Sequence, residues 1–502
     1  MANKACNEVV TVANMPMTVF DMISAMQNKY ADRVAFRYVE GKDTVVEKTY
    51  AQYVQDIRKA TGYLQQELGE PKGKKIVILS RTNYEYGAVV FGTMMAGAVI
   101  VTLNQGKTWA ELEYELGMVE PDLIFNDGID YGYRAQLEAL YGARLRPMDA
   151  WTAAPEAEMV NRIDHEGLLM LMFTSGTTGR SKGVMLSEKN YFTACQMYID
   201  GLKSVLDHEE RLVPQYLDQT FSHFTLVPMF HLAGFICYFV YGVQGWTLNL
   251  CCDARDLRRD MSLMHSDAMS TPPVLVEMIC NEVKRGHADR LNGLWNLSCS
   301  SAILDPAILS GLVKNGFYIN QCYSMTELAG YGLLNVTQEG DHLRALGKPD
   351  GFCEVKVDET GEICVRGGCV MLGYYKDPEA TAETIDKDGW LHTGDLARVD
   401  EEGYYYMTGR KKNLIILDSG ENVSPEELEG MVEKCPAVQE CIVKELGKKI
   451  GVVVYCEKEH QQTVRDFIAQ MNRTVPLYKR IGVVEFSETP LPRNGAGKLV
   501  RK

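Results

Sequence analysis

A short loop that combines glycines, hydroxyl side chains and one lysine constrains this chain more than any other segment. It reads FTSGTTGRSKG over residues 173–183. Glycines let backbone N–H groups turn inward as an anion-binding nest, hydroxyls donate to phosphate oxygens, and a lysine adds positive charge. The pattern therefore predicts a loop that binds a nucleotide. The candidate phosphate contacts are Thr174, Ser175, Gly176, Thr177, Thr178 and Lys182.

The residues on either side of this loop narrow the fold. The apolar run LLMLMF at residues 168–173 has the length of a strand, so the loop is expected to leave a buried strand. A glycine follows Lys182, where a Walker loop has Ser or Thr to hold magnesium, and this disfavours a P-loop kinase or GTPase. A surface turn is the usual interpretation of a Ser/Thr/Gly cluster, but the motifs further along the chain argue against it.

Length and composition limit the class of protein. A chain of 502 residues is expected to form at least two domains. The formal charge of −15 disfavours binding to nucleic acid or to a membrane surface, since both are polyanionic. The 14 cysteines are scattered without a C-x-x-C pair, which favours reduced thiols. With no signal peptide pattern and no apolar run of spanning length, we expect a soluble, cytoplasmic protein without a transmembrane segment.

Strand and helix patterns alternate along the first part of the chain. Residues 75–79 and 98–103 have the pattern of buried strands, and residues 84–96 between them have that of a helix. This order predicts an α/β fold: a large N-terminal domain of layered, mostly parallel sheets and helices, at residues 1–411. A small, mobile α+β domain is expected at residues 412–502, where Ser424, Pro425 and Glu427 form a helix-start signal.

Five further motifs follow the loop in a fixed order. They are YSMTE at residues 323–327, GEICVRG at 361–367, GWLHTGD at 389–395, GRKK at 409–412 and GK at 497–498. Together with the loop they resemble the adenylate-forming superfamily, which contains acyl- and aryl-CoA synthetases, nonribosomal adenylation domains and luciferases. The resemblance covers nearly the whole chain. It implies that ATP activates a carboxylate as an acyl-AMP, that a thiol then captures the acyl group, and that ATP, Mg²⁺ and CoA are required.

The resemblance also implies roles for individual residues. Tyr323 would stack on adenine, Thr326 would contact phosphate, and Glu327 would bind Mg²⁺, which prefers hard oxygen ligands. Asp395 and Arg410 would hold the ribose.

The last segment of the chain is expected to supply the catalytic lysine. By resemblance, Lys498 lies between the substrate carboxylate and the α-phosphate, where an ammonium about 4 Å from an anion contributes roughly 4 kcal/mol at an effective dielectric of about 20. Lys412 matches the hinge about which the C-terminal domain rotates, and Gly420 lies by the thiol channel. Ser301 and Ala302 lie where acid and adenine meet, in a segment with serines where many relatives have glycines.

The acid itself is less well defined. VPMFHLAG at residues 227–234 resembles the acyl- and aryl-CoA ligase form of its motif, with His231 at the carboxylate end of the acid. No Asp is present in this motif to pair with a substrate ammonium, so an acid without an α-amino group is favoured. Leu232, Ile236 and Ala329 suit an alkyl tunnel or an aryl slot equally well.

Three functions remain open from the sequence. The first is an AMP-forming acyl-CoA ligase for a fatty or aromatic carboxylate. The second is a stand-alone adenylation enzyme that loads the phosphopantetheine of an acyl carrier protein. The third, a nucleotide-binding regulator without turnover, is disfavoured by the presence of Lys498, Glu327 and Asp395.

Overall fold

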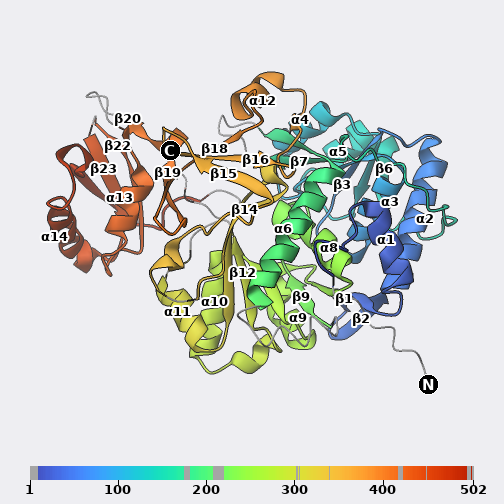
Figure 1. Ribbon diagram of the computed structural model, residues 1–502, viewed down its shortest axis with the longest axis horizontal. Coiled ribbons are helices and arrows are strands. Elements are labelled where there is room, and N and C mark those ends of the chain that lie inside the picture. Colours follow the sequence, from blue (N-terminus) through green and yellow to red (C-terminus); the bar gives the residue numbers. More distant parts are fainter. Residues whose placement is uncertain are drawn as a thin grey trace. The chain divides into compact units, whose positions relative to one another are not determined.

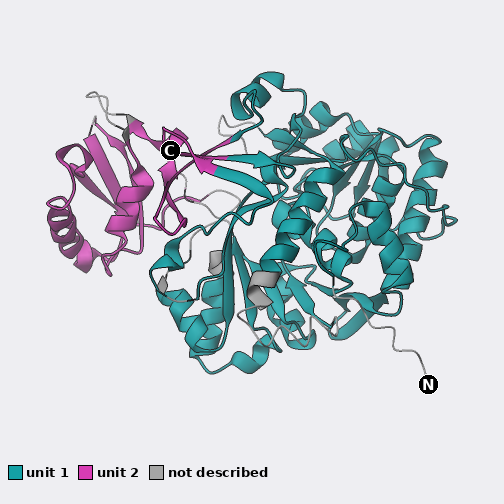
Figure 2. Ribbon diagram, in the orientation of Figure 1, with its two compact units in different colours: residues 1–355, 365–391 teal, residues 356–364, 392–502 magenta. Residues whose placement is uncertain are grey.

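The computed structural model describes most of the chain and divides it into two compact units. The described residues are 10–174, 181–206, 220–300, 304, 306–338, 340–416, 422–447, 449–493 and 499. Unit 1 consists of residues 1–355 and 365–391, and unit 2 of residues 356–364 and 392–502 (Figure 2). These units are defined by compactness, whereas the boundary predicted at residue 412 is that of a mobile domain. That boundary therefore stays a prediction.

A seven-stranded sheet in unit 1 contains β7 and β8, the two strands on either side of the glycine-rich loop. Its strand order is β17-β8-β7-β4-β3-β5-β6. The strands from β7 to β6 pair in parallel, whereas β8 and β17 are added antiparallel at one edge. The strands are β3 (Lys75–Leu79), β4 (Val99–Thr102), β5 (Leu123–Asn126), β6 (Leu145–Pro147), β7 (Met170–Thr174), β8 (Lys182–Leu186) and β17 (Gly373–Tyr374). The predicted α/β class is therefore confirmed.

A second sheet of eight strands has the order β14-β13-β12-β11-β9-β10-β1-β2. Its six inner strands are parallel, and the two edge strands β2 and β14 are antiparallel. The strands are β1 (Val34–Glu40), β2 (Thr44–Thr49), β9 (Ser222–Thr225), β10 (Thr247–Leu250), β11 (Ala268–Thr271), β12 (Asn296–Ser300), β13 (Tyr318–Met325) and β14 (Gly330–Asn335).

Helices cover these sheets, as parallel strands require (Figure 1). Several begin at side-chain caps; for example, Thr49 and Gln52 form a capping box at the start of α2. The helices of unit 1 are α1 (Val19–Asn28), α2 (Tyr50–Leu68), α3 (Tyr84–Met95), α4 (Trp109–Val119), α5 (Arg134–Tyr141), α6 (Glu188–Leu206), α8 (Leu232–Gln244), α9 (Leu257–Leu263), α10 (Pro273–Lys284), α11 (Pro306–Lys314) and α12 (Pro378–Thr384). Among the described residues, no helix is long and apolar enough to cross a membrane.

One face of the eight-stranded sheet forms an apolar core with α9, α10 and α11. Alternate strand residues supply this face, because successive side chains point to opposite sides of a sheet. They pack against buried side chains of the three helices. The face consists of Phe224, Met269, Leu297, Cys299 and Ile319.

Unit 2 has its own core. A three-stranded sheet, β22 (Glu440–Leu446), β23 (Lys449–Tyr455) and β24 (Val483–Ser487), packs with α13 (Pro425–Val432) and α14 (Gln461–Met471). α13 begins as expected: the Ser424 hydroxyl accepts from the Glu427 N–H, and Pro425 occupies the first turn. A short pair, β20 (Ile415–Ile416) and β21 (Asn422–Val423), lies near its start.

The division between the units falls within strands of a four-stranded sheet. Its order is β15-β16-β18-β19, with β15 at Cys353–Val357, β16 at Glu362–Gly367, β18 at Leu391–Val399 and β19 at Tyr405–Arg410.

We predict that Leu297→Ala lowers the free energy of unfolding of unit 1 by about 2–5 kcal/mol, because it leaves a cavity under the sheet. Leu297 is 0% exposed. Leu140→Ala is the control: at 60% exposure its change is expected to stay within about 0.5 kcal/mol. Urea unfolding followed by circular dichroism compares the two variants, and equal shifts in midpoint would contradict the assignment of Leu297 to the core.

Candidate active site

The ends of the glycine-rich loop are fixed by strand pairing. β7 ends at Thr174 and β8 begins at Lys182, and these two residues pair directly across the antiparallel strands. The predicted contacts Ser175, Gly176, Thr177 and Thr178 lie outside the described residues. Thr174 and Lys182 therefore stand together where the chain enters and leaves the loop.

A second lysine, missed by the sequence analysis, lies at the end of this loop. The Lys107 ammonium donates to the Ser181 hydroxyl at 3.3 Å and forms an ion pair with the buried carboxylate of Glu115. Because Glu115 balances its charge, Lys107 supports the base of the loop and adds little net positive charge to it.

Tyr374 brings Lys182 and Glu327 to the same place. The Lys182 ammonium lies 4.6 Å from the centre of the Tyr374 ring, a cation–π contact. The Tyr374 hydroxyl donates to a carboxylate oxygen of Glu327 at 3.0 Å. Glu327 is only 9% exposed. Burial, and then the negative charge of Glu327, raise the pKa of Tyr374, so its hydroxyl stays a donor.

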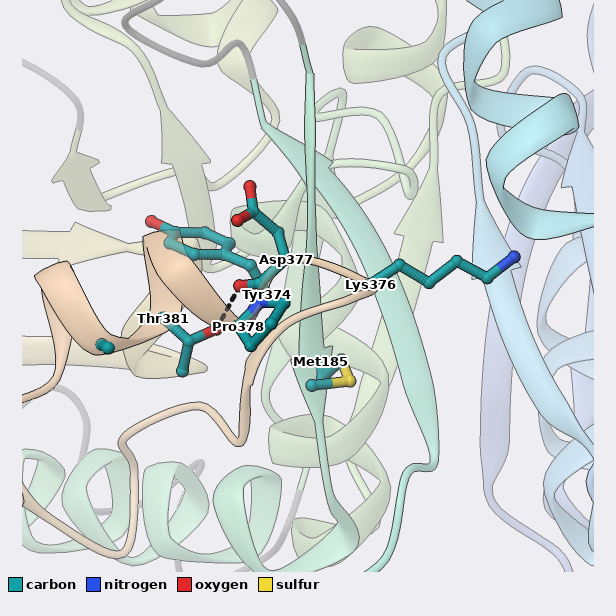
Figure 3. A pocket seen from close by; sticks show the side chains of 7 residues that line it. Met185, Tyr374, Lys376, Asp377, Pro378 and Thr381 are labelled. Atoms are coloured by element: carbon teal, nitrogen blue, oxygen red, sulfur yellow. Dashed lines mark hydrogen bonds between the residues drawn. The ribbon is translucent and has the colours of Figure 1, made fainter.

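Local structure holds Tyr374 in position. β17 pairs with β8 so that Tyr374 lies opposite Val184, and the Tyr374 N–H donates to the Thr381 hydroxyl at 2.8 Å (Figure 3). A cavity of about 380 Å³ lies beside this turn and is lined in part by Met185, Asp377 and Thr381. Lys376 extends away from Tyr374 in Figure 3, and its ammonium pairs with Glu120 at 2.9 Å.

The YSMTE motif lies at the carboxyl end of β13. Tyr323 belongs to the strand and is mostly buried, while Thr326 and Glu327 begin the 3₁₀ turn η4 (Thr326–Leu328). Ala329 ends this turn in a left-handed conformation, with φ of 54°. In open α/β sheets, ligands bind outside the carboxyl ends of the strands, so the three motif residues lie where a nucleotide site is expected.

In unit 2, Asp395 and Arg410 form a direct ion pair. They lie opposite each other on β18 and β19, with the guanidinium Nε 2.9 Å from a carboxylate oxygen. The Asp395 N–H also donates to the Thr393 hydroxyl at 3.1 Å. The structure thus brings the two residues predicted for the ribose together.

A group of possible metal ligands also lies in unit 2. Ligand atoms of Asp358, Cys364 and His392 all lie within 4.8 Å of one another. However, Glu362 contacts His392 at 3.3 Å and the Lys411 ammonium at 2.9 Å. Because a lysine already supplies positive charge beside this group, we assign no metal to it.

The face of the eight-stranded sheet toward α6 and α8 carries several polar side chains and lines a cavity of about 110 Å³. Ile236 of α8 is one of its apolar walls, whereas Leu232 and Ala329 are buried. Polar and apolar residues alternate in β12, Asn296–Ser300, and this pattern is visible in the sequence. The strand residues that line the cavity are His223, Ala268, Ser270, Asn296, Ser298, Asn320, Cys322, Tyr331 and Leu334.

His223 is held as a neutral ring in this cavity. Burial lowers the pKa of His223 to about 3. Its Nε2 accepts from the Ser270 N–H at 3.2 Å, and its Nδ1 lies 2.7 Å from the Tyr241 hydroxyl. Burial also raises the pKa of the nearby Cys322 thiol to about 11.

The remaining predicted residues are distributed as follows. His231 is exposed and caps the start of α8, where its Nδ1 accepts from the Ala233 N–H at 3.4 Å. Lys412 is exposed in the 3₁₀ turn η6 (Lys411–Asn413). Ser301, Ala302, Gly420 and Lys498 lie outside the described residues.

Two largely parallel sheets covered by helices define an α/β protein. The chain belongs to the AMP-binding enzyme family, whose model matches residues 24–375. The family resemblance inferred from the motifs is therefore confirmed.

Named relatives and solved structures extend this similarity over most of the chain. It is 28% identical over 484 residues to peroxisomal OPC-8:0-CoA ligase 1 of Arabidopsis thaliana, covering 87% of this chain and 84% of the relative. It is 26% identical over 544 residues to a long-chain-fatty-acid–CoA ligase of Escherichia coli O157:H7, covering 97% and 93%. The structure of O-succinylbenzoate coenzyme A synthetase (MenE) from Bacillus subtilis with ATP and magnesium ion superposes with a TM-score of 0.78 at 22% identity, covering 96% and 98%. This last similarity concerns the fold.

The depressed pKa of His223 predicts a specific loss of stability in acid. The unfolded chain binds a proton at this residue near pH 6.5 and the folded chain only near pH 3, so its contribution is complete above pH 6.5 and is lost as the pH falls toward 3. Between pH 7 and pH 5 this loss is about 2 kcal/mol. In His223→Gln, we expect the decrease in unfolding free energy between pH 7 and pH 5 to be smaller than in the wild type by about 2 kcal/mol.

Urea unfolding of wild type and variant at both pH values measures this difference. His265→Gln serves as the control, because the His265 side chain is 62% exposed and the residue lies outside the cavity. The same pH dependence in wild type and His223→Gln would contradict a buried neutral ring.

Proposed function

We propose that this chain is an AMP-forming acyl-CoA ligase that activates a fatty or aromatic carboxylate with ATP and transfers the acyl group to CoA. The observation that carries the proposal is the grouping of Lys182 and Glu327 around Tyr374. Membership of the AMP-binding enzyme family supports it. Two of its relatives, one from Arabidopsis thaliana and one from Escherichia coli, are both named as CoA ligases.

The first reaction joins two anions. A carboxylate oxygen of the acid bonds to the α-phosphorus while the bond to the β-phosphate breaks, and pyrophosphate leaves with that electron pair. Thr174 and Lys182 hold the phosphates at the strand ends, and the Tyr374 ring fixes the Lys182 ammonium from one side. Positive charge placed in advance lowers the barrier, because negative charge concentrates between the reacting groups.

Glu327 and Thr326 suit a magnesium ion brought by the nucleotide. Mg²⁺ is commonly held by one or two carboxylates together with substrate phosphates, and Glu327 offers hard oxygen beside the hydroxyl residue Thr326. When bound, the ion offsets the charge of the phosphates. Tyr374 orients one Glu327 oxygen by donating to it.

The remaining roles follow the family resemblance. We assign Tyr323, Ser301 and Ala302 to the adenine side of the site, His231 to the carboxylate end of the acid, and Lys498 to the charge between acid and α-phosphate.

Unit 2 also holds the residues that we assign to the ribose and to the second reaction. Asp395 binds the ribose hydroxyls, and Arg410, which pairs with it at 2.9 Å, keeps its carboxylate oriented. Lys412 is the hinge, and Gly420 borders the channel through which the CoA thiol reaches the acyl carbon. There the new C–S bond forms as the bond to AMP breaks, and the thiol proton passes to solvent.

A cytoplasmic location is also part of the proposal, although one relative is named as peroxisomal.

We expect the purified protein to release AMP from Mg-ATP only when a suitable carboxylic acid is present, and faster when CoA is added. Lys498→Ala should slow acid-dependent exchange of pyrophosphate into ATP by about a thousandfold, given roughly 4 kcal/mol from its charge. AMP release across short, medium and long fatty acids, aryl acids and amino acids, with and without CoA, tests this. Adenylate formation that ignores CoA would favour a carrier protein as acceptor, and silence across all acids would overturn the proposal.

Tyr374→Phe is expected to slow pyrophosphate exchange about 10- to 100-fold, since a hydrogen bond to a charged group contributes roughly 1.5–3 kcal/mol. Because Tyr374 acts through Glu327, the magnesium concentration needed for half-maximal exchange should rise as well. Tyr375→Phe removes a neighbouring hydroxyl and serves as the matched control. An unchanged magnesium requirement in Tyr374→Phe, at an unchanged Tm, would show that Tyr374 does not position Glu327.

A further inference from the structure

A buried carboxylate on β16 has no part in the reaction as proposed. Glu362 is only 2% exposed. Burying a charge is costly unless the charge is paired and hydrogen-bonded, so Glu362 depends on partners inside the fold. Its partners His392, Gly394 and Lys411 belong, like Glu362 itself, to unit 2. The set of partners indicates what this carboxylate does.

One oxygen of Glu362 binds the backbone of the neighbouring strand. Oε1 accepts from the Gly394 N–H at 2.7 Å. β16 and β18 are neighbours in the four-stranded sheet (Figure 1). Strand N–H groups ordinarily donate to backbone carbonyls of the adjacent strand, so a side chain here replaces a backbone acceptor. The Glu362 carboxylate therefore fixes the position of β18 at Gly394.

Gly394 has a conformation that interrupts the strand. Its φ is 74°, whereas φ in strands is about −120° to −140°. Glycine adopts positive φ without steric cost, so β18 can kink at this residue. Asp395 follows directly, and the direction of its side chain depends on the kink before it. The bond from Gly394 to Glu362 therefore acts at the residue that aims Asp395.

The Thr393 hydroxyl ties the same kink to β16 from the other side. It donates to the Ile363 carbonyl at 2.8 Å and accepts from the Asp395 N–H at 3.1 Å. Asp395 then pairs with Arg410 across β18 and β19. Arg410 orients the carboxylate of Asp395, while the kink fixes the backbone from which this carboxylate extends.

The second oxygen of Glu362 is held by two side chains. Oε2 accepts from the Lys411 ammonium at 2.9 Å, and Nδ1 of His392 lies 3.3 Å from it. A hydrogen bond between charged groups is stronger than one between neutral groups. With Oε2 fixed in this way, the planar carboxylate keeps Oε1 directed at the Gly394 N–H.

We propose that Glu362 is a positioning residue for the nucleotide: by holding the kink at Gly394, it places the Asp395 carboxylate against the ribose hydroxyls. This inference rests on the ribose-binding role proposed for Asp395. Loss of the Glu362 carboxylate should weaken recognition of the ribose hydroxyls in particular, because the phosphate contacts lie on other elements.

Nucleotides that lack one ribose hydroxyl test the inference. Calorimetry with the full chain measures the affinities of Mg-ATP, Mg-2′-deoxy-ATP and Mg-3′-deoxy-ATP, and it requires no acid substrate. We expect the wild type to bind ATP about tenfold or more tightly than at least one of the two deoxynucleotides, as befits a hydrogen bond to a charged group. In Glu362→Ala this affinity ratio should fall to about two or less.

Two conservative variants separate the reach of the side chain from its charge. In Glu362→Gln an amide oxygen can still accept from the Gly394 N–H, so the affinity ratio should stay within about threefold of the wild type. Glu362→Asp keeps the charge but is one methylene shorter and draws its oxygen away from Gly394. Its ratio should fall as in Glu362→Ala, and it provides the same test if Glu362→Ala does not fold.

Glu429→Ala is the matched control for the loss of a buried carboxylate. Glu429 is also in unit 2, is 8% exposed and accepts from a backbone N–H, that of Val443, at 2.6 Å. It lies on α13, away from the kink before Asp395. The affinity ratio of Glu429→Ala should therefore equal that of the wild type, even if its Tm is lower.

The outcomes decide the inference independently of the ligase function. A wild-type ratio in Glu362→Ala or in Glu362→Asp would overturn the positioning role, as would an equal fall in Glu429→Ala. If the wild type itself binds all three nucleotides alike, both the ribose role of Asp395 and this inference are wrong. Acid-dependent pyrophosphate exchange is measured separately: its absence from the wild type would overturn the ligase function, while the affinity ratios would still decide the role of Glu362.

Discussion

The eight-stranded sheet imposes the main constraint on this protein, because a parallel sheet must be covered on both faces. One face meets this requirement with apolar packing around Leu297 and Ile319. The other face is covered by α6 and α8 but keeps polar side chains and a cavity between sheet and helices. The two faces of the sheet thus differ: one packs apolar side chains against helices, and the other places polar side chains around a cavity.

Tyr374 contacts groups that lie far apart in the sequence. Lys182 opens β8, Glu327 follows β13 of the other sheet, and Tyr374 contacts both through its ring and its hydroxyl. β17 is only two residues long, yet its pairing with β8 sets where this side chain projects. Tyr374 therefore helps to join the two sheets of unit 1 at the proposed reaction centre, beside the hydrogen bond from the Met371 N–H to the Glu327 carbonyl.

Much of this organisation could be predicted from local patterns. Apolar runs identified β3, β4 and β7, and Ser424 with Pro425 identified the start of α13, because these signals depend on neighbouring residues. Tyr374 could not be found in this way, since its importance arises from pairing with a strand almost two hundred residues earlier. The alternation of polar and apolar residues in β12 was readable, but its meaning depends on which helices cover that face. The sequence also did not reveal that Lys107 is balanced by Glu115.

The burial of Cys322 has a consequence for an enzyme that makes an activated acid. An acyl-adenylate reacts with any accessible thiolate, and Cys322 directly precedes Tyr323 on β13. With a pKa of about 11, only about one in ten thousand of these thiols is ionised at pH 7. Burial thus protects the enzyme against acylating itself, and the activated acid is left to an incoming thiol that can ionise in water.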